Sequence, residues 1–321
     1  MVARSKQIFF LFYTLGYSLV ASSQLTDNSS SFKNISAERY FRLHYDNDVF
    51  ANTDYYYTQG ITLEYVHPVF KNGFLSALLY KPANSISKYG ASFNLWGYTP
   101  TSINSDSILY NDRPFEGSMS LKLFCISMNS SADLRLSSAI SFGVIGPAAL
   151  GKEIQTNIHR WTGNKIPKGW QYQIKNDIIL NYQIDLEKKW ISSKAFILNG
   201  AAELRAGSLD DRISGGINFM TGYFNDPFRS SGKKKMNCYL YGQGRINLIG
   251  YDATMQGGLF NRNNPYIIST DDITRTSFQA DAGLVLRFGK VYLSYNRSFI
   301  TKEFKQGRDH QWGGLNAGLA F

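Results

Sequence analysis

The chain has 321 residues, a formal net charge of +10 and 15% aromatic residues, with 28 glycines and 8 prolines. No run of about 18 uncharged apolar residues occurs after residue 23, which argues against a membrane-spanning helix. The basic residues are scattered apart from one run at 233–235. Nucleic-acid binding needs basic side chains gathered on one face, so we expect none here.

The first 23 residues have the pattern of a secretory signal peptide. Arg4 and Lys6 give a basic start, an apolar stretch covers residues 8–20, and small residues at 21–23 precede a cleavage point. The apolar stretch is shorter than the roughly 20 residues that a transmembrane helix needs. Residues 24–38 are polar, and we expect them to be a short disordered lead-in.

Residues 39–321 read as one domain, because no internal repeat occurs and alternation with a period of two recurs throughout. In the last segment Leu315, Ala317 and Leu319 alternate with polar or small residues. The pattern predicts twelve strands, at 39–48, 57–67, 88–98, 116–128, 133–144, 173–185, 194–207, 210–221, 236–249, 275–288, 290–300 and 311–321.

The alternation alone does not say which face is buried. A polar inner face with an apolar outer face is typical of a transmembrane barrel, whereas a soluble barrel or sandwich turns its apolar face inward. The signal peptide, the aromatic content and the C-terminal Phe321 favour the first reading. We therefore predict an all-β, antiparallel up-and-down barrel in the bacterial outer membrane.

Several polar residues converge if both termini of the barrel lie on the periplasmic side. Asn47 and Asp48 then end the first outward strand, and Thr58 begins the second at the same rim. The third outer loop, 145–172, contains His159. Residues 151–160 of this loop predict a short helix, on which Gln155 and His159 share one face because they are four residues apart.

Each of these residues also has an ordinary reading. Asn47 and Asp48 are common turn residues, Thr58 suits a strand, and exposed loop histidines such as His159 are frequent. The two cysteines, Cys125 and Cys238, lack the spacing of a metal site. An exported chain can pair them, but the apolar alternation around Cys125 favours a buried or lipid-facing free thiol.

The motifs around these residues resemble those of the outer-membrane lipid A 3′-O-deacylases. The N-terminal motif is Asp-Asn-Asp-Val-Phe at 46–50 with Thr-Asp-Tyr-Tyr-Tyr-Thr-Gln-Gly at 53–60. The central motif is Gly-Val-Ile-Gly-Pro-Ala-Ala-Leu-Gly at 143–151, then Gln155, His159, Arg160, Gly163 and Pro-Lys-Gly-Trp-Gln-Tyr-Gln at 167–173. The resemblance extends from about residue 39 to the C-terminus.

The resemblance implies a twelve-stranded barrel that hydrolyses the ester of the 3′-linked acyloxyacyl group of lipid A. The catalytic positions it implies are Asn47, Asp48, Thr58, Gln155 and His159. His159 is then the general base that activates water, and the other polar side chains donate to or position the oxyanion. Arg160 is a candidate for binding a lipid A phosphate, against an ordinary solvated arginine.

The resemblance also implies a divalent cation, usually calcium, which hard oxygen ligands would hold. Asp48 is a candidate ligand for this ion. At one position the chain departs from the family pattern. An acidic metal ligand is expected six residues after the histidine, and Lys165 stands there. Glu153 and Asp177 are the alternative acidic residues, and Asp48 has the alternative role of orienting His159.

The expected partners are lipid A or lipopolysaccharide as substrate and the lipids of the outer membrane, with no nucleic acid. We expect a monomer with its site on the extracellular side. Two other functions fit the same sequence. One is a phospholipase-type esterase using the same residues, and the other is a porin-like or structural barrel without catalysis. A barrel of about twelve strands has little open lumen, which disfavours the channel.

Overall fold

The computed structural model describes residues 28–51, 53, 55–229 and 234–321. The predicted signal peptide lies outside the described residues. None of the helices in the described ranges is long and apolar enough to cross a membrane.

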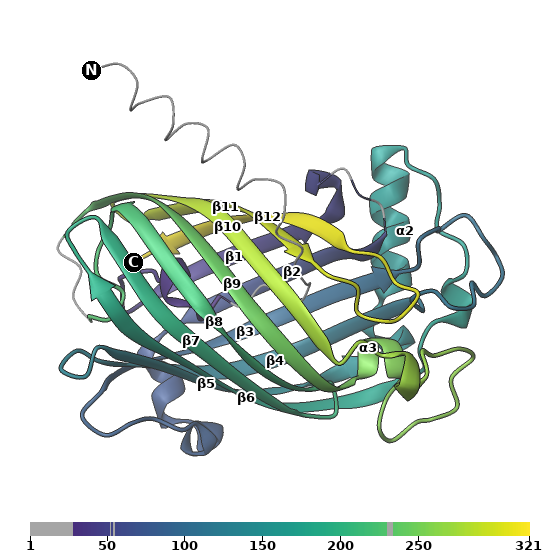
Figure 1. Ribbon diagram of the computed structural model, residues 1–321, viewed down its shortest axis with the longest axis horizontal. Coiled ribbons are helices and arrows are strands. Elements are labelled where there is room, and N and C mark those ends of the chain that lie inside the picture. The colour runs from purple at the N-terminus through teal and green to yellow at the C-terminus, as the bar shows by residue number, and fades with distance from the viewer. Residues whose placement is uncertain (1–27, 52, 54, 230–233) are drawn as a thin grey trace, which may run out of the picture.

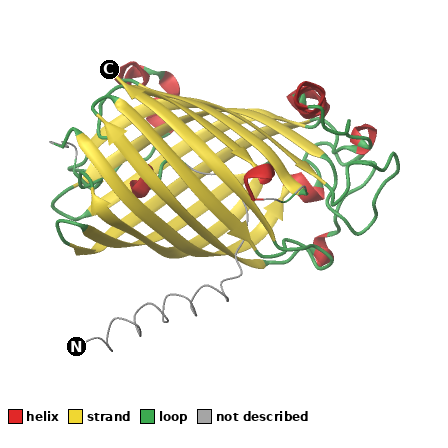
Figure 2. Ribbon diagram, turned by 90° about the horizontal axis from the view of Figure 1, so that it is seen from above, coloured by secondary structure: helices red, strands yellow, loops and turns green. Residues whose placement is uncertain are grey.

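The described residues form a closed antiparallel barrel in which each strand pairs with its chain neighbours and β1 pairs with β12 (Figure 1). Figure 2 shows the strands tilted around the wall. The strands are β1 (Tyr40–Asn47), β2 (Tyr56–Val66), β3 (Ile86–Thr99), β4 (Glu116–Asn129), β5 (Leu134–Ile145), β6 (Asp177–Ser192), β7 (Phe196–Gly207), β8 (Asp210–Tyr223), β9 (Met236–Asp252), β10 (Thr276–Phe288), β11 (Val291–Ile300) and β12 (His310–Ala320).

Burial shows which face of the wall is apolar. In β12 Leu315 and Leu319 are exposed, whereas Asn316 between them is buried in the lumen. The same division runs through β8, where Ile213 is exposed and Arg212 is buried. An apolar outer surface around a polar interior is the arrangement that hydrocarbon surroundings require. The prediction of a twelve-stranded transmembrane barrel is therefore confirmed.

The sixth strand is the one whose position differs most from the prediction. It was expected at 173–185 and lies at Asp177–Ser192. Beyond the expected end at 185, Glu187 and Lys189 alternate with exposed residues and are buried in the polar lumen. At its start, buried Ile174 belongs to the preceding loop, where its amide bonds the carbonyl of Phe115.

The helices are short and lie mainly in the connections. They are α2 (Gly151–Thr162), α3 (Ala253–Gln256) and the 3₁₀ helices η2 (Ser31–Lys33), η3 (Asp48–Ala51), η4 (Pro68–Asn72), η5 (Phe74–Leu78), η6 (Pro147–Ala149), η7 (Trp170–Tyr172) and η8 (Thr270–Asp272). The helix predicted in the third outer loop is α2. Figure 1 shows α2 and α3 at one end of the barrel, with the C-terminus at the other.

Residues 28–37 lie inside the barrel, which corrects the expected disordered lead-in. Phe32 stacks on Tyr241 with 4.3 Å between ring centroids, and its carbonyl accepts from Tyr239. The amide and hydroxyl of Ser31 both donate to Glu187 on β6. Polar segments are disordered when they find nothing to bury against. Here the polar lumen supplies the missing partners.

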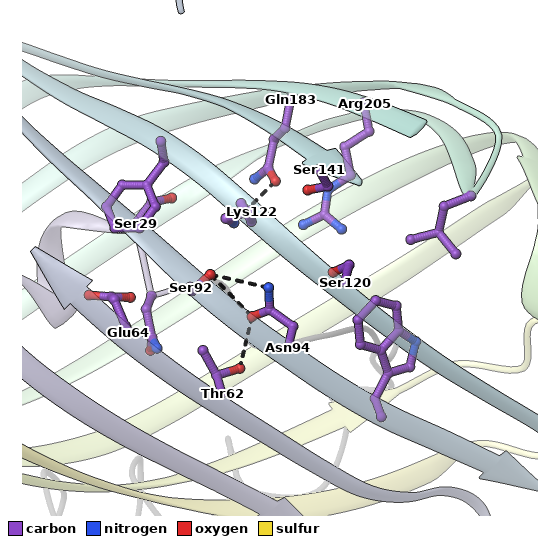
Figure 3. Close-up of a pocket in the computed structure, with 14 residues that line it drawn as sticks. Ser29, Thr62, Glu64, Ser92, Asn94, Ser120, Lys122, Ser141, Gln183 and Arg205 are labelled. Atoms are coloured by element: carbon purple, nitrogen blue, oxygen red, sulfur yellow. Dashed lines mark hydrogen bonds between the residues drawn. The ribbon is translucent and has the colours of Figure 1, made fainter. Parts of the chain in front are cut away.

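Further toward the loop end, polar side chains on the inner face of the wall are hydrogen-bonded to one another (Figure 3). Thr62 donates to Asn94 over 3.1 Å, and Asn94 donates to Ser92. Lys122 of β4 donates to Gln183 of β6 over 3.4 Å. A cavity of about 60 Å³ among these side chains has room for a few water molecules. The described wall therefore presents a hydrogen-bonded polar face to the lumen.

The two cysteines are both free thiols. Cys125 is fully buried on the outer face of β4, where it packs with Leu79, Tyr89 and Ile140. The connection between β2 and β3 contributes Leu79 and thereby covers the thiol. The buried free thiol is the interpretation that the alternation favoured.

Candidate active site

A polar cleft of about 600 Å³ lies on the outer side of the wall, at the barrel end that carries the long loops. Alternate residues of β1 point outward, and its last outward residues, Tyr45 and Asn47, form one side of the cleft. The helix α2 and the loop after it form the other side. The described residues that line it are Tyr45, Asn47, Asp48, Val49, Phe50, Thr58, Ile103, Asn104, Ile158, His159, Thr162, Asn164 and Lys165.

Glycines let α2 approach the wall closely. A Cβ added to Gly117 of β4 would lie 3.1 Å from the Cα of Gly151, the first residue of α2. A Cβ on Gly151 would in turn lie 2.9 Å from the ring of Trp170. Since cores tolerate little overlap, both positions need glycine for this contact. The start of α2 is thereby fixed against the outside of the barrel.

Trp170 and Gln155 connect the helix to the wall through hydrogen bonds. The buried indole of Trp170 donates to Gln155 Oε1 over 2.8 Å. This leaves the amide nitrogen of Gln155 to donate to Thr58 Oγ1 over 3.2 Å. Gln155 is 2% exposed and is absent from the cleft lining. It lies behind Thr58 and orients that hydroxyl.

Thr58 faces the cleft because β2 is irregular at this residue. Its pairing with β3 shifts between Tyr57 and Gln59, so that Thr58 is the unpaired residue of a bulge. In a regular strand Thr58 and Thr62 would lie on the same face, because they are four residues apart. Without the bulge Thr58 would therefore point into the lumen, as Thr62 does. Because its oxygen accepts from Gln155, the hydroxyl hydrogen of Thr58 is available to an acceptor in the cleft.

Asn47 joins the first strand to the second. Its side-chain nitrogen donates to the Thr58 carbonyl over 2.7 Å and to the Tyr45 hydroxyl over 3.2 Å, and its oxygen accepts from the amide of Val49. Asn47 therefore stabilises the turn and lines the cleft, while its catalytic role stays a prediction. Its two amide hydrogens are engaged, so its role in the cleft is to hold the bulge at Thr58.

His159 lies one helical turn after Gln155 and lines the cleft, as the predicted spacing required. Its Nδ1 atom is 2.5 Å from the carbonyl oxygen of Lys165. A carbonyl only accepts, so Nδ1 carries the proton in this contact and Nε2 has the basic lone pair. The loop backbone thus fixes the tautomer that a general base needs.

Asp48 and Lys165 place opposite charges in the cleft. The carboxylate of Asp48 is 2% exposed, at the start of η3, and Lys165 lies on the loop after α2. The imidazole of His159 is held by the Lys165 carbonyl, and none of its described hydrogen bonds involves Asp48. Orientation of the histidine is therefore assigned to the loop backbone.

The described residues of the cleft do not fit a calcium ion held by protein carboxylates. Calcium takes six to eight oxygen ligands, whereas these described residues include one carboxylate, Asp48, together with a lysine. No group of three or more His, Cys, Asp or Glu that suits a metal occurs in the described part of the chain. The calcium dependence that the resemblance implies is untested, and the rate in the presence of a chelator decides it.

Three other predicted residues lie outside the cleft lining. Glu153 and Arg160 are exposed on α2. Asp177 accepts the amides of Phe260 and Asn261 at 2.7 and 2.9 Å and so anchors the loop between β9 and β10. Neither acidic residue supplies the carboxylate that Lys165 replaces, and the structure gives Arg160 no contact in the cleft.

The fold and the cleft define an integral outer-membrane β-barrel protein with a polar site on its lipid-facing side. The model of the family described as outer membrane protein LpxR matches residues 8–321, so the chain belongs to the LpxR family. This confirms the resemblance to the lipid A 3′-O-deacylases and places the protein in the bacterial outer membrane.

A solved structure of an LpxR protein shows the same fold. LpxR from Salmonella typhimurium is 20% identical with a TM-score of 0.71, over 88% of this chain and 100% of that chain. The β domain of the Bordetella autotransporter BrkA is 7% identical with a TM-score of 0.45, over 88% and 98% of the two chains. The NanC porin is 7% identical with a TM-score of 0.39, also over 88% and 98%. Among curated protein sequences there is no match.

Proposed function

We propose that the protein is a lipid A 3′-O-deacylase whose cleft faces the outer leaflet from the extracellular rim. Membership in the LpxR family supports a lipid A deacylase role. The observation that carries the reaction is the contact between His159 Nδ1 and the Lys165 carbonyl, which leaves Nε2 as a base beside the cleft. The position of the cleft on the outer wall gives a membrane lipid direct access to it.

The reaction begins when His159 Nε2 takes a proton from water and the water oxygen attacks the ester carbonyl carbon. A tetrahedral oxyanion forms. It collapses by breaking the bond to the 3′ oxygen of the sugar, and the imidazolium returns its proton to that oxygen. The products are the acyloxy fatty acid and a sugar hydroxyl. His159 thus ends the cycle in its starting state.

Two groups of the cleft are suited to stabilise the oxyanion. The hydroxyl of Thr58 has its lone pair engaged by Gln155 and its hydrogen available. The ammonium group of Lys165 adds a positive charge on the loop that holds His159. Fixed donors of this kind lower the barrier by about 3–4 kcal/mol each. Asn47 and Gln155 act as positioning residues, because they hold the bulge and the hydroxyl.

The described lead-in residues do not favour the channel alternative. Ser31 and Phe32 lie inside the barrel, where they contact Glu187 and Tyr241, and so obstruct the lumen. A phospholipase-type esterase would use the same cleft, so only the choice of substrate separates it from a lipid A deacylase.

The test is the lipid A mass spectrum of a lipopolysaccharide-producing host that expresses the protein. We expect the wild type to remove one acyloxyacyl group and His159→Ala to leave lipid A intact. His67→Ala is the matched control, because His67 follows β2 at the opposite rim. The purified protein is also given phospholipid and lipid A side by side. Intact lipid A with the wild type, or hydrolysis of phospholipid alone, would refute the proposal.

A further inference from the structure

An apolar trough of about 480 Å³ lies on the outer wall of β10, β11, β12 and β1, facing the membrane. Its sides are formed mainly by Leu43, Tyr45, Leu293, Tyr295 and Leu315. The trough spans two outward residues on each of these four strands. Tyr45 belongs to the row nearer the rim, where β1 ends at Asn47.

Ala317 gives the trough its depth. In the register of the sheet Ala317 stands between Leu43 of β1 and Leu293 of β11. Two residues nearer the rim, the outward-facing residues paired across the same strands are all large: Tyr45, Leu315 and Tyr295. A methyl group flanked by two leucine side chains leaves a depression in the lipid-facing surface. The side chain at 317 therefore controls the volume of the trough.

The trough continues into the polar cleft. Tyr45 lines both spaces. Phe50, which lines the cleft, meets the edge of Tyr45 at 6.2 Å and of Tyr295 at 6.5 Å between ring centroids. Phe50 lies over Gly313, where an added Cβ would be 2.6 Å from the Cβ of Phe50. Three aromatic rings thus form an apolar bridge between the trough and the cleft.

We propose that the trough binds the acyl chain of the lipid substrate while its ester lies in the cleft, and that Ala317 sets the accepted chain length. The inference rests on the proposed function. Hydrocarbon is the matching occupant for an apolar surface in the membrane. The aromatic bridge connects a chain in the trough to the cleft that His159 lines.

The first experiment compares synthetic 3-O-acyl glucosamine esters with a butanoyl or a tetradecanoyl chain. We expect Ala317→Leu to lower kcat/KM for the long ester by about tenfold or more, because added methyl groups in a fitted apolar site have effects of this size. The butanoyl ester, which is too short to pass the aromatic bridge, keeps its rate. Ala206→Leu is the matched control, since Ala206 is an exposed residue of β7 in another part of the wall.

Binding is measured separately so that catalysis is not required. His159→Ala protein in phosphatidylcholine nanodiscs is titrated with non-hydrolysable ether analogues of both chain lengths. The long analogue should bind more tightly, and Ala317→Leu should remove that preference while Ala206→Leu keeps it. If the preference exists but wild type hydrolyses neither ester, the trough stands and the proposed reaction fails.

The opposite outcomes overturn the trough. Hydrolysis of both esters with no change in chain preference on Ala317→Leu would leave the reaction standing and refute the acyl-chain site. An equal loss for both chain lengths, or the same loss from Ala206→Leu, would identify a general effect on the barrel in its lipid surroundings. A change from monomer to dimer on filling the trough would identify a second copy of the chain as its occupant.

Discussion

His159 Nδ1 lies 2.5 Å from the carbonyl oxygen of Lys165, six residues further along the chain. The contact does two things at once. It fixes the tautomer of the imidazole, and it closes the loop that brings the Lys165 side chain to the cleft. The imidazole of His159 and the side chain of Lys165 are therefore placed by a single backbone contact at the end of α2.

A first prediction separates these two effects. In His159→Asn the amide nitrogen can occupy the position of Nδ1 and donate to the Lys165 carbonyl, but no basic nitrogen is left. We expect this variant to lose activity by about 10²–10⁴-fold, the usual contribution of a general base, and to be as inactive as His159→Ala. Rates on purified lipid A check this. Substantial activity in His159→Asn would mean that the residue mainly anchors the loop.

A second prediction concerns Lys165 and metal dependence. Because the cleft residues do not fit calcium and Lys165 supplies a positive charge, turnover should continue in the presence of a chelator. Lys165→Met should lower kcat by about 10²–10³-fold, the loss that follows removal of one group stabilising an oxyanion. The backbone contact to His159 remains in this variant. Steady-state rates with chelator and with added calcium measure both effects.

Lys168→Met is the control for this experiment, because Lys168 is exposed on the same loop and is absent from the cleft lining. It should keep the wild-type rate. Loss of turnover on chelation, with recovery when calcium is returned, would show that an ion takes part and that Lys165 has not replaced it.

The strands and the convergence at one rim follow from the sequence, because a period of two and the even strand count of a closed barrel fix which ends lie together. The position of the site on the outer wall does not follow in the same way. Regular alternation along β2 would place Thr58 in the lumen together with Thr62. No clear sequence feature marks the bulge that turns Thr58 to the outer face.

Other errors have a common physical cause. β6 continues past its expected end at 185, and the polar lead-in residues 28–37 were expected to be disordered. In this barrel the interior is the polar phase, so Glu187 and Ser31 bury each other there. The hydrogen bond from Trp170 to Gln155 was not foreseen either, since it depends on how the loop folds back over the start of α2.

A third prediction tests the docking of α2. Gly151→Ala adds a Cβ 2.9 Å from Trp170 and 3.1 Å from the Cα of Gly117. The helix must then move away from the wall, and Gln155 loses its hold on Thr58. We expect activity to fall by about tenfold or more, since misplacement by an ångström has costs of this order. The barrel itself should stay folded, which heat-modified mobility on gels will show.

The control is Gly215→Ala in β8, where an added Cβ meets nothing within 4 Å. It should change neither activity nor stability. If Gly151→Ala is fully active, the close approach of α2 to β4 is not needed for the geometry of the cleft.

A fourth prediction uses Glu303, a buried carboxyl in the loop between β11 and β12 that contacts Arg113. Burial raises the pKa of Glu303 to about 7 from 4.5, because the loss of hydration outweighs the attraction of Arg113. The folded protein then binds a proton that the unfolded chain has released. This contribution to stability is complete below pH 4.5 and is lost as the pH rises through about 7.

Glu303→Gln lacks the titrating carboxyl, so a comparison of this variant with the wild type isolates the contribution of that carboxyl to stability. The free energy of unfolding of the wild type, minus that of Glu303→Gln, should fall by about 3 kcal/mol between these limits, at about 1.4 kcal/mol per pKa unit. Urea unfolding in lipid vesicles at several pH values measures it. Asp272→Asn gives a control of opposite sign, because the hydrogen bond from Ser269 lowers the pKa of exposed Asp272. Its stabilising contribution is lost as the pH falls. A wild-type advantage over Glu303→Gln that grows with pH would show that the charged pair with Arg113, and not the neutral acid, is the form that the fold prefers.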